Sequence, residues 1–168
     1  MKKIFSFSAI LIDLAMTVQA QTGTKLQVVL NQYYAVKNSL VAGDAAKAGA
    51  SANEFVKSVN SVETKALPAE EQKVFQSLQA KILADAGSIA ALKDISKQRE
   101  TFASLSTSMI SLAKAAKITD AIIYVDYCPM KKSSWLSDEK AIKNPYYGSA
   151  MLTCGNVKET IKQLGLRL

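Results

Sequence analysis

Histidine is absent from the 168 residues of this chain, and cysteine occurs only twice. Without histidine, the chain cannot build a Ser-His-Asp or Cys-His catalytic arrangement, a histidine-ligated zinc site or a histidine pH switch. Two cysteines are too few for a disulfide-rich scaffold or for an iron–sulfur cluster held by one chain. No nucleophile is visibly set against a base, so we expect that the protein is not an enzyme.

The composition is that of a folded, basic protein. Hydrophobic residues make up 49% of the chain and charged residues 21%, which is enough apolar material for a core and argues against intrinsic disorder. The formal net charge is +7, but the lysines are spread along the chain and do not alternate with aromatic residues. We therefore interpret the charge as a solvated cationic surface and expect no nucleic-acid partner.

Residues 1–20 have the pattern of a secretory signal peptide. Lys2 and Lys3 precede an apolar run, and Ala20 ends a relaxed small-x-small cleavage site. Asp13 weakens the apolar run, and the clean stretch is shorter than the roughly 20 residues that a permanent membrane anchor needs. We predict cleavage, no stable membrane insertion afterwards, and a periplasmic or otherwise extracytoplasmic location.

Apolar residues recur at steps of three and four through residues 21–120, which predicts helices with one buried stripe each. Gly43 is typical of a helix stop, while Asp44 and Asp94 are typical N-cap residues. The connections are short, which favours antiparallel neighbours. The fold class is therefore predicted to be all-α, an up-down-up-down four-helix bundle. The four stripes lie in residues 26–40, 48–62, 75–92 and 95–116.

The character of the sequence changes in residues 121–168. A β-branched and aromatic run at 121–125 is typical of a short strand, and residues 157–164 are interpreted as a short terminal helix. Both cysteines and several aromatic residues lie between these two elements. We predict an irregular extension that packs on the bundle.

Four sulfur-bearing side chains are concentrated in two short stretches of this extension. Cys128 and Met130 form a C-x-M motif, and Met151 and Cys154 form an M-x-x-C motif. Alternate residues of an extended segment face one way, as do residues three apart on a helical turn. Thiolates and thioethers are soft ligands that favour Cu(I) or Ag(I), so these four residues are the candidate metal ligands. Trp135 is a candidate cap over such an ion.

A disulfide between Cys128 and Cys154 is the main alternative. Export would favour it, and closing the loop would stabilise the fold by about 3.5 kcal/mol in the chain-entropy model. Met130 and Met151 would then be ordinary packing residues, as most methionines are. Free buried thiols are a third reading. The sequence leaves these alternatives open, and a reduced form that binds copper is compatible with an oxidised form that releases it.

Four short motifs follow one another in residues 124–161 in a characteristic order. They are Tyr127-Cys128-Pro129-Met130, Trp135-Leu136-Ser137, Ile142-Lys143-Asn144-Pro145-Tyr146-Tyr147-Gly148 and Met151-Leu152-Thr153-Cys154-Gly155. This segment resembles a bacterial periplasmic family known as a domain of unknown function. The family occurs as short exported proteins and fused to the C terminus of heavy-metal efflux adaptor proteins of the copper/silver type. Motifs at 34–42 and 98–102 extend the resemblance over nearly the whole mature chain.

The resemblance implies an association with copper or silver handling, with a heavy-metal efflux adaptor or another envelope protein as partner. Similar Cys-Pro-Met modules of copper transporters usually continue with histidine where this chain has Lys131, which removes one expected ligand. The turn from Asn144 to Gly148 is expected to position the second sulfur stretch against the first. The residues expected to support the site are Tyr127, Trp135, Asn144, Pro145, Tyr146, Tyr147 and Gly148.

The sequence therefore supports two alternative functions. The first is an exported protein that binds Cu(I) or Ag(I) and buffers the ion or delivers it to an efflux system. The second is a metal-free interaction module in which a Cys128–Cys154 disulfide fixes the aromatic segment.

Overall fold

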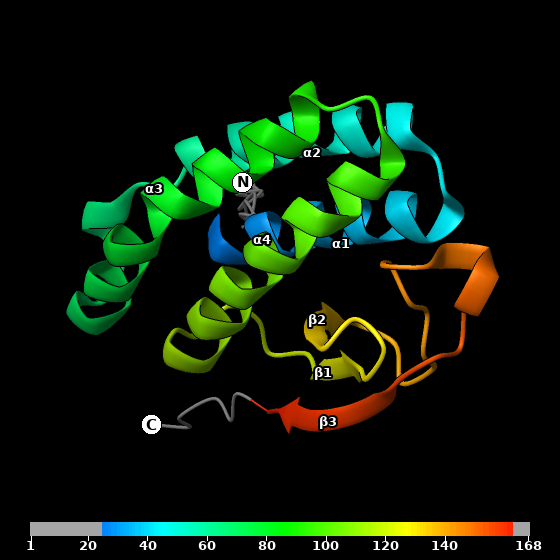
Figure 1. Cartoon of the computed structure of the whole chain (residues 1–168). Coiled ribbons are helices and arrows are strands. Elements are labelled where there is room, and N and C mark those ends of the chain that lie inside the picture. Colours follow the sequence, from blue (N-terminus) through cyan, green and yellow to red (C-terminus); the bar gives the residue numbers. More distant parts are fainter. Residues whose placement is uncertain (1–24, 163–168) are drawn as a thin grey trace, which may run out of the picture.

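The computed structural model describes residues 25–162, in which four long helices are followed by a small sheet (Figure 1). The predicted set of helices is confirmed, and the described chain is mostly helical. The predicted signal peptide at 1–20 lies outside the described residues. The helices are α1 (Lys25–Ala42), α2 (Ala45–Asn60), α3 (Ala69–Ala91) and α4 (Ile95–Ala115), with short 3-10 turns η1 (Thr64–Ala66) and η2 (Gly148–Met151).

Local signals in the sequence set the helix ends. Gly43 follows α1 with φ +75°, a left-handed conformation that glycine adopts without strain. The Asp44 carboxylate then accepts a hydrogen bond of 2.8 Å from the backbone N–H of Lys47 and caps α2. Asp94 does the same for Lys97 at the start of α4, at 2.9 Å. The predicted stop and both predicted caps are therefore confirmed.

Consecutive helices pack against each other, α1 on α2, α2 on α3 and α3 on α4. Their shared core is apolar, and Leu40, Phe55 and Leu105 have no exposed surface. Gln98 is one of several buried polar side chains of the helices and lies at one end of them. Its side-chain amide donates to the carbonyl oxygens of three residues at the helix ends, so it ties the α3–α4 connection to the start of α2. These acceptors are Ala45, Ile89 and Leu92.

The C-terminal region forms a three-stranded antiparallel sheet in the order β2-β1-β3. Its strands are β1 (Ile123–Cys128), β2 (Ser133–Ser137) and β3 (Asn156–Ile161). The predicted short strand is confirmed as β1. Figure 1 shows the sheet against the side of the helices formed by α1 and α4, and β2 contacts α4.

The predicted short helix over 157–164 is wrong in its described part. Asn156–Ile161 instead pairs with β1, where Ile123 lies opposite Ile161 and Asp126 opposite Val157. Pairing satisfies the backbone groups of β1 on that side, and a helix of eight residues would gain little stability by itself. Residues 163–164 lie outside the described chain. The region expected to be irregular is therefore built around a sheet.

The outer edge of β2 is tied to the rest of the molecule by two tyrosines. The Tyr33 hydroxyl of α1 accepts a hydrogen bond from the backbone N–H of Leu136 at 3.1 Å. The Tyr146 hydroxyl donates to the carbonyl oxygen of Ser134 at 2.7 Å. These contacts occupy backbone groups on an edge that could otherwise pair with another chain. Among residues 25–162, no helix has both the length and the hydropathy needed to cross a bilayer.

Candidate metal centre

The sheet brings the two cysteines together. Cys128 is the last residue of β1 and is fully buried, while Cys154 lies two residues before β3 and is partly exposed. The pairing of Tyr127 with Asn156 sets the end of β1 beside the start of β3. Both side chains are free thiols. The pKa of Cys154 is raised by desolvation and then by its hydrogen bond with Cys128 and the charge of that residue, so the two thiols are neighbours.

A tight loop holds Cys128 in place. Residues 129–132 connect β1 to β2, and Lys132 adopts a positive φ of +55° within this connection. The backbone N–H of Lys131 donates to the sulfur of Cys128 at 3.4 Å. This contact connects the backbone of the loop to the sulfur of Cys128.

Asn144 holds the second cysteine. Its side chain is fully buried, and its amide donates to the carbonyl oxygen of Cys154 at 2.7 Å. Its side-chain oxygen accepts from the backbone N–H of Tyr146 at 2.8 Å, and its own N–H donates to Leu152 at 2.8 Å. Pro145, next along the chain, is also buried. One side chain thus connects the 144–146 turn to the backbone that carries Cys154.

Trp135 packs behind this backbone. It has no exposed surface, and its ring meets that of Tyr146 edge-on with centroids 5.7 Å apart. Gly155 takes a φ of +147°, and a Cβ there would come within 2.8 Å of the Tyr127 carbonyl oxygen and 3.1 Å of the Trp135 ring. The close approach of β1, the indole and the residue after Cys154 therefore requires glycine.

The two predicted methionine ligands lie on the surface. Met130 is 62% exposed and Met151 is 41% exposed. Each belongs to the same short stretch as one of the cysteines, and the backbone N–H of Cys154 donates to the carbonyl oxygen of Met151 at 3.1 Å. The structure thus brings the two thiols together and leaves both thioethers as accessible side chains of the flanking loops.

The remaining predicted support residues have separate roles. The Tyr127 ring lies under the ammonium group of Lys158, 5.5 Å from its centroid. Gly148 has a φ of +56°, and a Cβ there would come within 2.8 Å of the Val41 carbonyl oxygen and would overlap the guanidinium of Arg99. Tyr147 is partly buried and lines a cavity described below.

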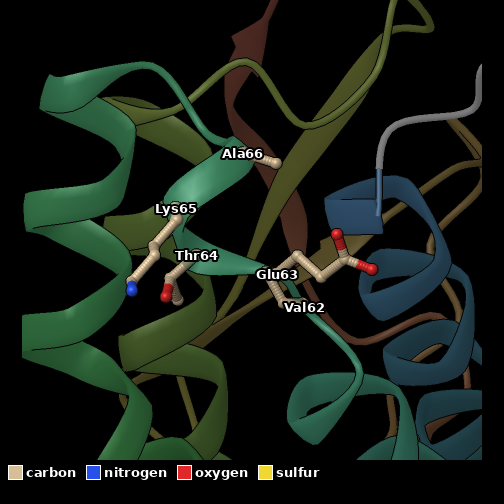
Figure 2. Close-up of a pocket in the computed structure, with 5 residues that line it drawn as sticks. All are labelled: Val62, Glu63, Thr64, Lys65 and Ala66. Carbon is tan, nitrogen blue, oxygen red and sulfur yellow. The ribbon is translucent and has the colours of Figure 1, made fainter.

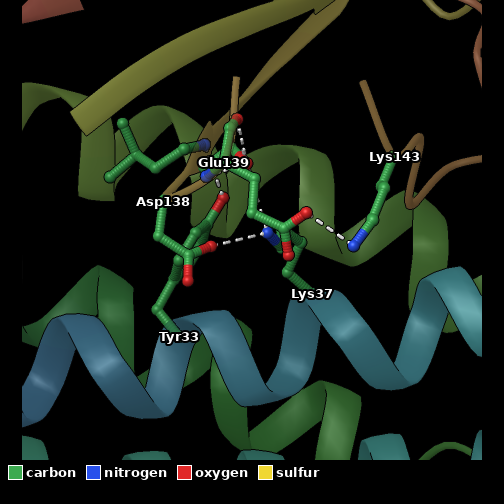
Figure 3. A network of polar contacts seen from close by, with 7 residues as sticks. Tyr33, Lys37, Asp138, Glu139 and Lys143 are labelled. Carbon is green, nitrogen blue, oxygen red and sulfur yellow. Dashed lines mark hydrogen bonds and ion pairs between the residues drawn. The ribbon is translucent and has the colours of Figure 1, made fainter. Parts of the chain in front are cut away.

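A charged network that no sequence motif indicated lies beside the sheet, with Lys37 as its buried member (Figure 3). The Lys37 ammonium has no exposed surface and lies 3.2 Å from the carboxylate of Asp138. It also donates to the Ser137 hydroxyl at 3.3 Å and sits 5.2 Å from the centroid of the Tyr34 ring. The signal was present, because Lys37 follows Tyr33 by four residues and so lies on the apolar stripe of α1.

Asp126 of β1 is the second charged group in this region. It is fully buried, and neither carboxylate oxygen has a hydrogen-bond partner within the described part of the chain. Desolvation raises the pKa of Asp126 to about 7, although the positive charge of Lys37 opposes this shift. The group is therefore partly protonated at neutral pH.

The cavity with the most space among those described lies elsewhere. It has a volume of about 530 Å³ and is lined by residues 62–66, which join α2 to α3 (Figure 2). It shares no residue with the cysteine pair or the aromatic turn. Among residues 25–162, no three His, Cys, Asp or Glu side chains are grouped so that they could hold a metal ion. The cysteine pair is thus a two-sulfur set, and its free, neighbouring thiols fit a soft ion.

Residues 29–121 match a family described as "Protein of unknown function (DUF3347)". The chain belongs to this family. The DUF3347 match covers most of α1, all of α2 to α4 and nearly all of the linker to β1, and it ends before either cysteine. No curated protein and no solved structure shows a significant match. The predicted membership of a family of unknown function is confirmed, and the predicted periplasmic and efflux context stays a prediction.

Proposed function

We propose that this protein is an exported Cu(I)- or Ag(I)-binding protein that buffers the ion or delivers it to an efflux system. The observation that carries the proposal is the contact between Cys128 and Cys154. These residues are distant in sequence, and each is held by a hydrogen bond of its own, Cys128 at the end of β1 and Cys154 in the loop before β3. Two thiolates held side by side form a ligand set suited to a soft monovalent ion.

The difference in burial between the two thiols suits uptake and release. Cys128 is enclosed, whereas Cys154 is partly exposed and can exchange ligands with an incoming carrier. Met130 and Met151 lie exposed beside them and would capture the ion before the thiolates hold it. Because the pKa of Cys154 is raised, binding displaces a proton and strengthens as the pH rises.

The wider setting of the proposal rests on the sequence. The signal pattern at 1–20 supports a periplasmic or other extracytoplasmic location, and the family resemblance supports a heavy-metal efflux adaptor as partner. We also propose that α1 to α4 run up-down-up-down, since consecutive helices pack together through short connections. The absence of enzymatic activity, of nucleic-acid binding and of membrane insertion after cleavage stays a prediction.

Anaerobic titration with Cu(I) in the presence of a competing chelator tests the metal site. We expect one ion per chain, and protection of both thiols from alkylation. Cys128→Ser and Cys154→Ser should each weaken binding by about 100-fold or more, equivalent to about 2.8 kcal/mol. Met130→Ala and Met151→Ala should have smaller effects, about tenfold or less.

Leu152→Ala is the matched control for Met151→Ala, because it truncates a neighbouring, similarly exposed side chain that has no sulfur. Its Cu(I) affinity should equal that of the unaltered protein. Unchanged stoichiometry and affinity in both serine variants would reject these ligands.

The same contact supports a second function, a metal-free interaction module fixed by a Cys128–Cys154 disulfide. Alkylation of the exported protein without reductant distinguishes the two. Thiols that resist alkylation, and that bind no copper after reduction, would favour the disulfide. A partner from the cell envelope that binds equally with and without copper would favour the same reading.

A further inference from the structure

A cavity of about 290 Å³ lies between the first turns of α4 and the two loops that flank the cysteine pair. Arg99 and Glu100 of α4 line one side of it. Lys131 reaches it from the β1–β2 loop, and Tyr146 and Tyr147 from the turn before η2. Segments far apart in sequence thus converge on one small space that contains two positive charges and one negative charge.

The guanidinium of Arg99 is fixed in the wall of this cavity. Its Nη2 donates to the carbonyl oxygen of Leu40 at the end of α1, at 2.9 Å. The absence of a side chain at Gly148 makes the room that it occupies. Its Nε is buried and has no hydrogen-bond partner among the residues that the structure describes. The hydrogen bond to the end of α1 therefore uses Nη2 of the guanidinium, whereas Nε is left as a buried donor that no described residue uses.

Lys131 contributes the second positive charge. Its backbone N–H is bonded to the Cys128 sulfur, which fixes the loop, while its ammonium group forms no ion pair with any residue in 25–162. Arginine and lysine together in a cavity wall are a common arrangement for binding carboxylate or phosphate groups. The rings of Tyr146 and Tyr147 provide apolar walls beside them.

We propose that this cavity binds a small oxyanion, a carboxylate or a phosphate, between Arg99 and Lys131. The oxyanion pairs with the guanidinium of Arg99 and with the ammonium of Lys131. Glu100 lies on the same wall, so a ligand with an additional N–H or O–H donor would bind more tightly than one with an oxyanion alone. The site contains neither cysteine, so it does not depend on the proposed copper function.

Two-dimensional ¹H–¹⁵N spectra of the reduced protein, in a buffer free of phosphate and carboxylates, provide the test. Inorganic phosphate and acetate are titrated separately, with sodium chloride keeping the ionic strength constant. We expect saturable shifts at the amides of Arg99, Lys131 and Tyr147. Saturation by phosphate alone identifies a phosphate site, and saturation by acetate alone identifies a carboxylate site.

Lys131→Gln should weaken the saturable binding by about tenfold or more, because it removes one charge-assisted contact. Lys132→Gln is the matched control, since it removes the same charge from the next residue, which does not line the cavity. Arg99→Lys should also weaken binding, and the amide shifts at the end of α1 will report whether its cap survives. Shifts that do not saturate, or equal affinities in the Lys131 and Lys132 variants, indicate an adventitious ion only and overturn the proposal.

Discussion

The helices and the C-terminal sheet bury different kinds of side chain. Between the helices the enclosed residues are mainly apolar, with Phe55 and Leu105 as examples. Where the sheet and its loops meet α1, Lys37, Asp126 and Asn144 are all fully buried. Apolar contacts tolerate many arrangements, whereas each buried polar group needs a specific partner. The C-terminal region should therefore be more sensitive to single polar substitutions and to pH.

This contrast coincides with a boundary in the sequence. The DUF3347 match covers residues 29–121 and ends just before β1. Both cysteines, Asn144 and the aromatic turn lie beyond that match. The helical region thus defines the family to which the chain belongs, while the candidate chemistry lies in the sheet attached to it.

Asn144→Ala should have the largest effect of the polar substitutions. It removes both side-chain hydrogen bonds and leaves the Cys154 carbonyl and the Tyr146 N–H without those partners. Each unsatisfied buried group costs about 1–3 kcal/mol, so for the two groups we expect a loss of about 2–6 kcal/mol in the free energy of unfolding. Urea denaturation measures this loss.

Asn53→Ala is the control for this substitution in the helical region, because Asn53 is exposed on α2. We expect its unfolding free energy to stay within about 0.5 kcal/mol of that of the unaltered protein. Similar losses in both variants would contradict the proposed contrast between the two regions.

Asp126→Asn should produce the second-largest effect, and this effect should depend on pH. Burial raises the pKa of Asp126 to about 7, above the value near 4 expected in the unfolded chain. Between these two values the folded state binds the extra proton, so the contribution of Asp126 to stability falls as the pH rises from about 4 to 7. Above about pH 7 Asp126 is ionised in both states, so its contribution to the free energy of unfolding no longer changes with pH.

The asparagine side chain of the variant cannot ionise, so the variant should not lose the stability that the ionisation of Asp126 costs. At pH 8 we expect it to be more stable than the unaltered protein by about 1–3 kcal/mol, and at pH 4 the difference should largely vanish. Urea denaturation across this range measures the difference between the two proteins. A difference that does not change with pH would show that Asp126 does not titrate in this window.

The sequence predicted the helices well because their signals are local. Gly43, Asp44 and Asp94 act within a few residues of their own positions, and the apolar stripes repeat within each helix. The sheet depends instead on pairing across long stretches of chain. Residues 157–161 pair with β1, and nothing within that segment alone distinguishes a strand from a short helix.

The candidate site was predictable only in part, for the same reason. The C-x-M and M-x-x-C motifs identified Cys128 and Cys154, but their contact depends on the register between β1 and β3. Lys37 could have been found, because it lies on the apolar stripe of α1, but a long charged side chain on such a stripe usually reaches solvent. The burial of Asp126 depends on how the sheet packs on the helices, which the sequence of β1 does not show.

Asp138→Asn should have the smallest effect of the three, and it compares ion pairs in the two regions directly. Asp138 is 51% exposed, but its partner Lys37 is fully buried and cannot turn to solvent when the carboxylate is lost. Lys37 keeps the Ser137 hydroxyl and the Tyr34 ring, and solvent already screens Asp138. We therefore expect a loss of about 1 kcal/mol in unfolding free energy.

Glu54→Gln removes the carboxylate of the Lys57 pair on α2, in which the side chains are 56% and 70% exposed. An exposed helix pair of this spacing contributes about 0.5 kcal/mol or less, and Lys57 regains water when it is lost. Urea denaturation of both variants at low and high salt separates the two cases, because screening should abolish the Glu54 effect and only reduce that of Asp138. Equal losses with equal salt dependence would mean that Lys37 is as well hydrated as Lys57, and that charge burial does not distinguish the sheet interface from the helices.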